Sequence, residues 1–326
     1  MILTRVATLA LLLGLLAGAL HAQDAKPDLE SLWKTGSLWE VGDNRAKVQE
    51  ARKAIIAAGA EGRKFALTKL GVTAGLEIRC LNAVFAGWGA EAFDDLVANI
   101  AHENSVARRN VAEILSALND AKAAGPLLAQ AEKEESLSPR LSQLAALAKW
   151  KIEDAVPLLV EISRSETERV RHRAAGLLGE YETVTAVNRL IELLDDNVYY
   201  VRDGARDALA AGTPAARALC LARLREQLEL SPAEQDLQRI RLLLPVISTL
   251  ADAGVPALLQ KALKHETGSV RGEAGGALVN WKLTAGLLDA EPDVDAALKQ
   301  ALDSEYDPYA KATLEKALAR LDEAKK

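Results

Sequence analysis

The sequence predicts an all-α fold, an α-α superhelical solenoid of about eight helix pairs. The first observation is composition: aromatic residues make up 4% of the chain, Ala and Leu are abundant, and no run of alternating β-branched residues occurs. Such a composition favours helices over strands. The second observation is a short sequence unit that recurs along the chain, which is typical of a repeat architecture.

The recurring unit reads Val-Arg-x-x-Ala-x-x-x-Leu and begins at Val170, Val201 and Val270. Its apolar positions lie four and eight residues apart, so they share one face of a helix. Arginines at 31-residue intervals extend the pattern from Arg202 back to Arg109. The repeat arginines predicted from this pattern are Arg63, Arg109, Arg140, Arg171, Arg202 and Arg271.

Each Val-Arg helix is expected to pair with a second apolar helix, because a turn follows it and another apolar segment then begins. Proline near the start of that segment, as at Pro157 and Pro256, suits the first turn of a helix. The predicted helices lie near residues 45–58, 61–70, 75–87, 90–101, 105–119, 122–134, 137–150, 153–164, 167–180, 183–195, 198–211, 214–228, 232–252, 254–265, 267–283, 292–302 and 306–323.

These units resemble the HEAT-repeat family, in particular its phycobilisome-lyase-like subtype. The resemblance lies in an acidic turn followed by Val-Arg-x-x-Ala-x-x-x-Leu-Gly, and it covers most of residues 45–320. It implies a curved right-handed superhelix of the armadillo-like kind, with the Val-Arg helices along a concave side that usually binds partners. The resemblance is specific for fold and says little about function.

The first residues have the layout of a secretory signal peptide. Arg5 supplies a positive charge, residues 6–16 form an apolar run, and small residues follow. The apolar stretch from Val6 to Leu20 holds 15 residues, whereas a membrane-spanning helix needs roughly 20. A cleaved signal is therefore favoured over a membrane anchor. Cleavage is expected after Ala22, with Ala19 as the second choice.

The expected organisation is a signal peptide over residues 1–22, an N-terminal capping segment over 23–44 and the solenoid over 45–326. Trp33 and Trp39 are expected to help cover the exposed end of the stack, as terminal repeats must. The mature protein is expected to be exported, either periplasmic or secreted, and not inserted in a membrane.

The chain is acidic, with a formal net charge of −6. Removing residues 1–22, which hold one arginine and no acidic residue, makes it −7. An acidic surface without a basic cluster repels phosphate backbones and anionic lipid surfaces. The sequence therefore argues against nucleic acid as a partner.

No catalytic constellation is found in the sequence, which lacks a Gly-rich phosphate loop, a Gly-x-Ser-x-Gly elbow and a Cys-x-x-Cys pair. Its histidines beyond the signal are His102, His172 and His265, too few to gather several metal ligands. In an iron enzyme that shares the HEAT fold, deoxyhypusine hydroxylase, His-Glu pairs follow the repeat arginine, whereas Arg173 follows His172 here. We expect no metal, no cofactor and no enzymatic activity.

Two other features suggest sites but have simpler explanations. Asp289, Glu291, Asp293 and Asp295 alternate as in a calcium loop but lack its glycine and closing Glu, so we interpret them as a helix start. Cys80 and Cys220 would lie about four helix pairs apart, on the order of 35 Å. A disulfide allows only about 7 Å between Cα atoms, so two free thiols are predicted.

The arginine series is interpreted as structural, each arginine bonding the acid or the carbonyls of the turn before its helix, rather than as a ladder for an acidic partner. Small residues are frequent in the later Val-Arg helices, although each glycine makes helix formation less favourable than alanine by about 1 kcal/mol. These glycines either let a partner segment approach or tighten helix packing. They are Gly176, Gly204, Gly272, Gly275 and Gly276.

The expected function is that of an exported, non-enzymatic HEAT-repeat scaffold that binds a protein or peptide partner on its concave face. The candidate binding residues lie on neighbouring Val-Arg helices near the middle of the array and are His172, Arg173, Arg202, Asp203 and Arg206. The alternative is a lyase-like protein, or an accessory subunit of an enzyme that acts on a protein or a small ligand. Phycobilisome-lyase-like proteins attach or remove bilins, a chemistry that belongs inside the cell.

Overall fold

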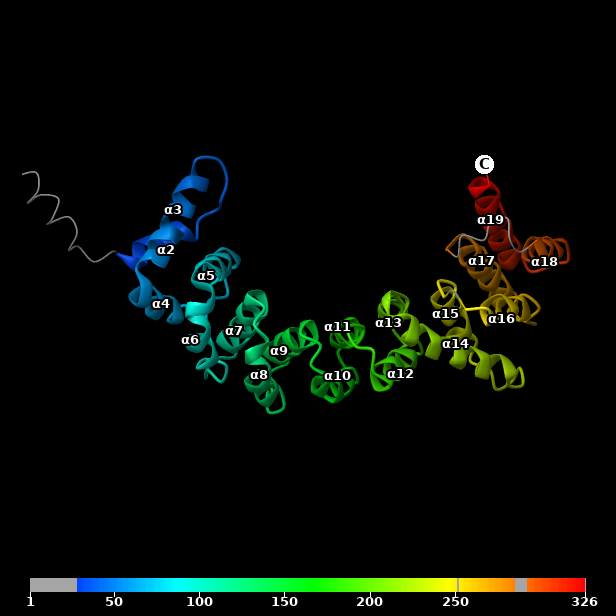
Figure 1. Ribbon diagram of the computed structural model, residues 1–326, viewed down its shortest axis with the longest axis horizontal. Helices are drawn as coiled ribbons and strands as arrows, with labels where there is room; N and C mark the ends of the chain where they lie inside the picture. The colour runs from blue at the N-terminus through cyan, green and yellow to red at the C-terminus, as the bar shows by residue number, and fades with distance from the viewer. Residues whose placement is uncertain (1–27, 251, 285–291, 326) are drawn as a thin grey trace, which may run out of the picture. The chain divides into compact units, whose positions relative to one another are not determined.

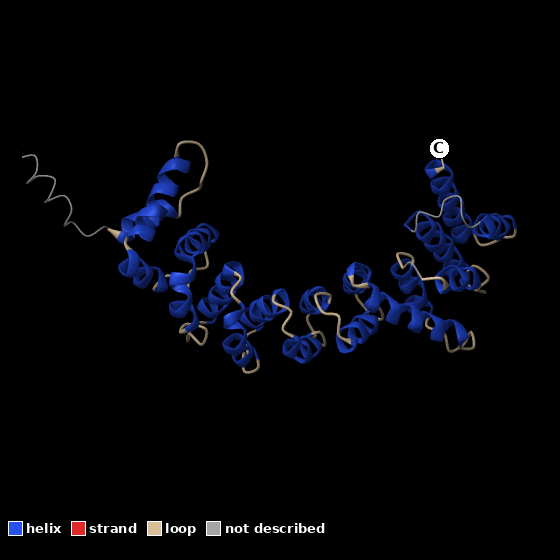
Figure 2. Cartoon of the chain, in the orientation of Figure 1, coloured by secondary structure: helices blue, strands red, loops and turns tan. Residues whose placement is uncertain are grey.

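The computed structural model describes residues 28–250, 252–284 and 292–325. These residues form helices joined by short turns, and no strand occurs among them (Figure 2). The predicted all-α fold is confirmed for this part of the chain. The predicted signal peptide lies outside it. Within the described ranges, no helix is both long and apolar enough to cross a bilayer.

The helices follow one another with short connections (Figure 1). They are α2 (Leu29–Gly36), α3 (Asn44–Ala57), α4 (Gly59–Leu67), α5 (Gly75–Trp88), η1 (Gly89–Ala92), α6 (Phe93–Val97), α7 (Ser105–Leu118), η2 (Ala121–Ala123), α8 (Ala124–Ala131), α9 (Leu137–Lys149), η3 (Glu153–Ala155), α10 (Val156–Ile162), α11 (Glu168–Leu178), α12 (Val184–Leu193), α13 (Tyr199–Ala211), α14 (Pro214–Glu229), α15 (Leu237–Ile247), α16 (Gly254–Ala262), α17 (Gly268–Thr284), α18 (Pro292–Asp303) and α19 (Pro308–Ala324).

The chain divides into two compact units. The N-terminal unit comprises Met1–Gln130 and Glu134–Gln143, and the C-terminal unit comprises Ala131–Lys133 and Leu144–Lys326. In the C-terminal unit, α11, α13, α15, α17 and α19 pack side by side in a first layer. The helices α10, α12, α14, α16 and α18 form a second layer, and each packs on the first-layer helix that follows it. This alternation is the predicted helix-pair repeat.

In the N-terminal unit, α3, α5 and α7 pack in succession, and α4 and α6 alternate with them along the chain. The capping segment contains a helix, α2. The Asp28 side chain caps its first turn by accepting the Ser31 N–H at 3.1 Å. Trp33 in α2 is 2% exposed and meets Phe65 edge-on at 6.1 Å. Trp39, in contrast, is 55% exposed.

The apolar face of the repeat is buried as its spacing predicts. Val201, Ala205 and Leu209, one copy of the motif in α13, are at most 1% exposed. The equivalent residues of α17 are fully buried. Burying a large apolar side chain contributes roughly 1.5–3 kcal/mol, so the repeating stripe holds the two layers together.

Several predicted helices differ from the structure: those expected over residues 122–134 and 153–164 each begin with a 3₁₀ turn, η2 and η3, before α8 and α10. The helix expected over residues 232–252 begins only at Leu237, because Asp236 caps it by accepting the Arg239 N–H at 3.0 Å. Asp and Asn favour this cap position and so set the start of a helix. The helix expected over 90–101 is divided into the 3₁₀ turn η1 and the short α6, after Gly89 takes a positive φ of 55°.

The glycines of the Val-Arg helices fall into two groups. A Cβ on Gly272 or Gly275 would press against α19, at Ala310 and Leu314 respectively. These two glycines therefore tighten helix packing and leave no room there for a partner segment. A Cβ on Gly176 or Gly276 would meet nothing within 4 Å.

The two cysteines are free and buried, with no exposed surface. Cys80 lies in α5 of the N-terminal unit and Cys220 in α14 of the C-terminal unit. Burial raises the pKa of both thiols, that of Cys220 to about 12.

Candidate functional site

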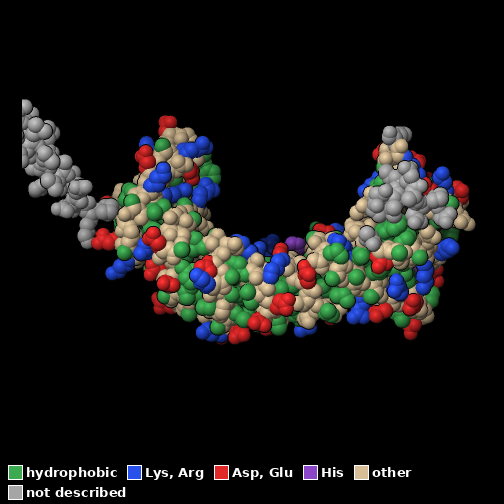
Figure 3. All heavy atoms as spheres, in the orientation of Figure 1, with side chains coloured by type: hydrophobic (Ala, Val, Ile, Leu, Met, Phe, Trp, Pro, Cys, Tyr) green, Lys and Arg blue, Asp and Glu red, His purple; other side chains and the backbone are tan. Residues whose placement is uncertain are grey.

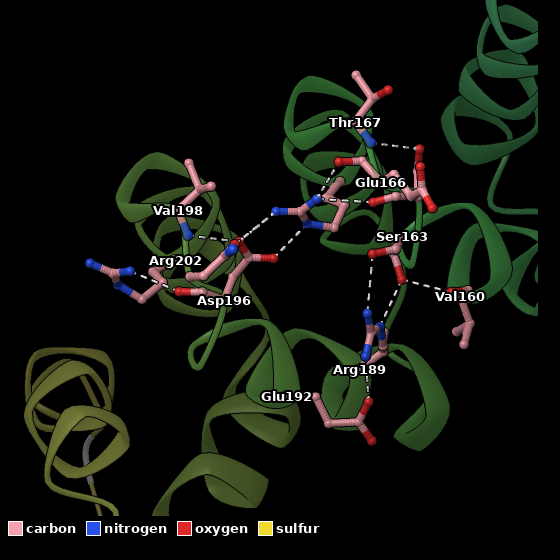
Figure 4. Close-up of polar contacts among 12 residues, drawn as sticks. Val160, Ser163, Glu166, Thr167, Arg189, Glu192, Asp196, Val198 and Arg202 are labelled. Carbon is pink, nitrogen blue, oxygen red and sulfur yellow. Dashed lines mark hydrogen bonds and ion pairs between the residues drawn. The ribbon is translucent and has the colours of Figure 1, made fainter.

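Arg171 links two consecutive turns of the C-terminal unit. Its Nη1 donates to the carbonyl oxygens of Ser165 (2.9 Å) and Glu166 (3.1 Å), in the turn before its own helix. Its Nε and Nη2 donate to the two carboxylate oxygens of Asp196, at 2.7 and 2.9 Å, in the turn before α13. Asp196 also accepts the backbone N–H of Val198 at 2.9 Å (Figure 4). We call this arrangement the arginine staple.

Arg108 forms the same staple in the N-terminal unit. Its Nη1 donates to the carbonyl oxygens of His102 (2.8 Å) and Glu103 (2.9 Å). Its Nε and Nη2 donate to the Glu134 carboxylate at 2.6 and 2.8 Å. Glu134 accepts the Ser136 N–H at 3.1 Å, just as Asp196 accepts the N–H two residues further on.

Arg271 forms a third staple. Its Nη1 donates to the carbonyl oxygens of His265 and Glu266, both at 2.8 Å. Its Nε and Nη2 donate to the Glu305 carboxylate at 2.7 and 2.6 Å. Glu305 accepts the Asp307 N–H at 2.9 Å. The staple thus recurs with one geometry, although the acid follows its arginine by a different number of residues each time.

The staple acids are held in the ionised state. Hydrogen bonds from Arg108 lower the pKa of Glu134 to about 2, and those from Arg271 lower the pKa of Glu305 to about 2. Burial by itself would raise the pKa of Asp196, but hydrogen bonds from Arg171 and a backbone N–H outweigh it and lower that pKa. The Glu134 and Glu305 side chains are only 1% and 2% exposed. Buried carboxylates of this kind need their guanidinium partner.

The backbone register identifies the staple position along the first-layer helices. The N–H groups of Arg140, Arg171, Arg202 and Arg271 each bond the carbonyl four residues earlier, at the first residue before the helix. In α7 the residue with this bond is Arg108, not the predicted Arg109. The 31-residue interval from Arg109 to Arg140 therefore runs one residue out of phase with the structural repeat.

Two of the predicted repeat arginines make other contacts. The Nη2 of Arg109 donates to Asn110 Oδ1 at 3.0 Å, one residue along its own helix. Arg63 lies in α4, which alternates with the α3–α5–α7 row, and its Nε donates to Asp95 in α6 at 3.2 Å. A related link occurs in the second layer of the C-terminal unit, where the Nε of Arg189 donates to the Ser163 hydroxyl at 2.7 Å (Figure 4).

Arg202 occupies the staple position of α13 but lacks the staple's carboxylate. Its Nη1 donates to the Asp196 carbonyl oxygen at 2.7 Å (Figure 4), as the staple requires. Its Nε and Nη2 have no acceptor among the described residues. Of the two contacts expected for a repeat arginine, the acid or the carbonyls of the turn before its helix, Arg202 makes the carbonyl contact, and the Asp196 carboxylate binds Arg171 instead.

A cleft of about 190 Å³ opens beside Arg202, and we call it the α13–α15 cleft. It brings together three of the predicted binding residues, Arg202, Asp203 and Arg206, with residues of the next two first-layer helices. The complete lining is Tyr199, Arg202, Asp203, Arg206, Gln238, Arg241, Leu242, Pro245 and Glu273.

The charged groups of the cleft are paired to different degrees. Arg206 is fully engaged, with Asp203 at 2.9 Å and with Asp207 at 3.1 and 2.9 Å. Arg241 is held loosely, its Nη2 at 3.7 Å from a carboxylate oxygen of Glu273. Arg202 and Arg241 therefore keep donors that the surrounding residues leave open.

An aromatic row borders the cleft. The His172 and Tyr200 rings meet edge-to-face at 5.6 Å, and Tyr200 meets Tyr199 in the same way at 5.6 Å. Tyr199 lines the cleft and is 67% exposed. A Cβ on Gly204 would lie 2.8 Å from the His172 ring, so glycine is needed there for the ring to lie as it does. Arg173 is exposed and does not line the cleft.

Sequence reasoning missed Tyr199, Gln238, Arg241 and Glu273. The repeat motif is degenerate in α15, where the staple position holds the buried Ile240, so the sequence predicted this helix but gave no candidate binding residue on it. Two features would have indicated it: the adjacent tyrosines at the start of α13, and the arginines on both sides of Ile240.

A larger cavity of about 560 Å³ lies farther along the C-terminal unit. Its lining comes from α16, α18 and the turns before α17 and α19 and includes Lys264, His265, Gln300 and Tyr306. The guanidinium of Arg271 lies 5.1 Å from the centre of the Tyr306 ring. The Nε and Nη2 donors of Arg271 are both occupied by the Glu305 carboxylate. The guanidinium therefore has no free donor edge for a ligand in this cavity.

The described residues contain no group of three or more His, Cys, Asp or Glu side chains that could hold a metal ion. His102 and His265 belong to the turns, where each Nδ1 accepts the backbone N–H two residues on at 3.0 Å. Of the acidic run compared with a calcium loop, Asp289 and Glu291 lie outside the described residues. Asp295 accepts a hydrogen bond from Lys282 at 2.6 Å.

Acidic and basic side chains are interspersed over the face shown in Figure 3. A nucleic-acid interface would need a basic stripe.

The chain is similar to one family model and to solved structures. A family model described as HEAT repeats matches residues 125–210, which include the helices from α9 to α12 and most of α13. The X-ray structure of YibA from Escherichia coli is similar over 91% of this chain and 97% of its own, at 16% identity and a TM-score of 0.42. The crystal structure of Kap121p is similar over 92% of this chain and 38% of its own, at 15% identity and a TM-score of 0.48. No curated protein matches. The predicted resemblance to HEAT repeats is thus confirmed over residues 125–210, where the family model matches.

Proposed function

We propose that the protein is an exported, non-enzymatic scaffold that binds a protein or peptide partner along the first layer of its C-terminal unit. The observation that carries this proposal is the α13–α15 cleft, which combines open guanidinium donors with the exposed Tyr199. Exposed tyrosine and arginine are enriched where proteins bind other proteins. Arg202, Asp203 and Arg206 are the proposed contacts, with His172 at the edge, while Arg173 lies outside the cleft.

The test compares partner capture by three forms of the protein. A double variant, Arg202→Glu with Arg206→Glu, reverses the charge of the cleft and is expected to lose the partner that the unchanged protein captures from the exported fraction. Arg164, an exposed arginine in the turn after α10, provides the control: Arg164→Glu changes charge in the same unit away from the cleft and should leave capture intact. Equal capture by all three forms would refute this placement.

Export is supported by the sequence of residues 1–22, a basic start followed by an apolar run that is short for a membrane span. Expression of the full chain with a C-terminal tag should yield a processed protein in the exported fraction. Mass spectrometry of its N-terminus should identify Gln23 or Leu20 as the first residue, according to whether cleavage follows Ala22 or Ala19. An unprocessed chain that stays in the cell would contradict this part of the proposal.

A second candidate is a lyase-like or accessory role with a small ligand, and the cavity of about 560 Å³ is the observation that favours it. A bilin incubated with the purified protein would then remain bound through gel filtration and retain its visible absorbance. Loss of all bilin from the protein would leave the scaffold as the only candidate.

A further inference from the structure

The three staples define how this protein binds a carboxylate. In each, the Nε and Nη2 edge of the guanidinium faces both oxygens of one acid, at distances from 2.6 to 2.9 Å. Paired, charge-assisted hydrogen bonds of this kind are the strong and directional way in which arginine binds a carboxylate. A fourth arginine in the same register with the same edge unoccupied is therefore a carboxylate site without its carboxylate.

Arg202 is that arginine, whereas Arg140, which shares the register, has interaction partners. Its backbone N–H and its Nη1 make the staple's bonds to Val198 and to the Asp196 carbonyl oxygen. In each staple the acid lies three residues before the first residue of the next first-layer helix, and so two before the residue that precedes that helix. For Arg202 that position holds Glu234, since Asp236 caps α15. Glu234 is exposed and accepts instead from the Ser231 hydroxyl at 2.6 Å.

The path of the chain explains why Glu234 is turned away. α14 spans 16 residues, more than the other described second-layer helices of its unit. Near its end, Gln227 accepts the Asp236 N–H at 2.9 Å. In the three staples the acid itself accepts that N–H. Gln227 has therefore taken the backbone bond that would draw Glu234 toward Arg202.

The open edge of Arg202 borders the α13–α15 cleft, which has room for a side chain and not for a large ligand. Arg241, loosely paired with Glu273, adds a second cation on the opposite wall. Tyr199 adds an exposed ring at the rim. The cleft thus offers two guanidinium groups to a carboxylate of a bound peptide. It also offers an aromatic surface to the peptide residue beside that carboxylate.

We propose that an acidic side chain of a bound peptide completes the fourth staple on Arg202, with an aromatic or apolar neighbour of that residue on Tyr199. The proposal rests on the peptide-binding function above and names its ligand chemistry. We choose a carboxylate because the staples of Arg108, Arg171 and Arg271 each hold one. A phosphate group is left as an outcome of the test.

The experiment selects random dodecapeptides displayed on phage against the purified, processed protein. Enriched peptides are expected to share one Asp or Glu beside an aromatic or large apolar residue. Each is synthesised with that acid and with its amide, and both are titrated by fluorescence anisotropy. A bidentate charged pair contributes about 1.5–3 kcal/mol, so the amide peptide should bind roughly ten- to a hundredfold more weakly.

Arg202→Gln should weaken binding of the acidic peptide by the same factor and leave the affinity for the amide peptide unchanged. Arg202→Lys should recover little, because an ammonium cannot make two parallel bonds. Arg173→Gln removes the same charge from the exposed surface of α11 and should have no effect. Glu234→Gln should also have no effect, because Glu234 does not occupy the site.

The outcomes separate this inference from the proposed function. Selected peptides without an acid preference, or with an affinity that Arg202→Gln does not change, would overturn the inference and leave the scaffold function standing. Tighter binding of phosphoserine peptides than of acidic ones would replace the carboxylate with a phosphate and overturn it as well. The absence of any enriched peptide would overturn both proposals.

Discussion

The guanidinium of Arg171 joins the carboxylate of Asp196 through two hydrogen bonds of 2.7 and 2.9 Å, across 25 residues of sequence. Both side chains are largely buried, 13% and 7% exposed. Because the same arginine also binds the carbonyls of the preceding turn, it fixes one helix pair against the next. Arg171 thus makes a structural contact, and its acid comes from the following unit rather than from the turn before its own helix.

The first prediction concerns the phase of the repeat. Arg108→Met removes the partner of Glu134, which is 1% exposed, and should destabilise the protein by about 3–5 kcal/mol, the usual cost of leaving a buried charge unpaired. Arg109→Met is the matched control and should cost less than about 1 kcal/mol, since its contacts are local and partly exposed. Urea denaturation followed by circular dichroism measures both. A larger loss of stability for Arg109→Met than for Arg108→Met would mean that Arg109 is the repeat arginine, as the 31-residue spacing predicted.

The second prediction concerns acid. The pKa of Glu134 and of Glu305 is about 2 in the folded protein, against an ordinary value of 4.5. Between these values the unfolded chain binds more protons than the folded one, so lowering the pH favours unfolding. The stabilisation is complete above pH 4.5 and is lost progressively down to pH 2, at most about 3 kcal/mol per pair.

Urea denaturation at several pH values between 6 and 2.5 tests this dependence. The Glu305→Gln variant should be less stable at pH 6 and should lose less stability on acidification than the unchanged protein. A parallel loss in both proteins would show that Glu305 does not contribute to the acid sensitivity.

The third prediction contrasts two adjacent glycines of α17. Gly276→Ala should stabilise the protein by up to about 1 kcal/mol, because alanine favours the helix and its Cβ meets open space. Gly275→Ala should destabilise it, because the added methyl overlaps Leu314 of α19, and overpacking costs about 1–3 kcal/mol. Differential scanning calorimetry distinguishes the two signs. Equal shifts in Tm would mean that α19 does not pack on α17 as described.

The fourth prediction concerns the thiols. Cys80 and Cys220 are fully buried and burial raises the pKa of each, so neither should react with DTNB at pH 8 in the folded protein. Both should react completely in 6 M urea, including in protein purified from an oxidising compartment. Single Cys→Ala variants assign each reaction. A chain that yields no free thiol on denaturation would contradict the prediction of unpaired cysteines.

Local patterns made most of the fold predictable. Val201, Ala205 and Leu209 are spaced for one helical face, and the structure buries all three. The site was predictable only in part. Arg202, Asp203 and Arg206 are neighbours on one helix, so the repeat indicated them together, whereas Arg241 and Glu273 come from helices whose approach depends on packing.

The sequence by itself determined the helix content, the two-helix period and the residues of the buried stripe, because spacing along a helix decides which side chains share a face. Only the tertiary structure decided which acid meets which arginine. The partners of Arg108, Arg171 and Arg271 lie 26, 25 and 34 residues further on, and this distance follows from the length of each helix pair. For the same reason Arg202 is left open: a long α14 turns Glu234 away, and no pattern in the sequence records that change of path.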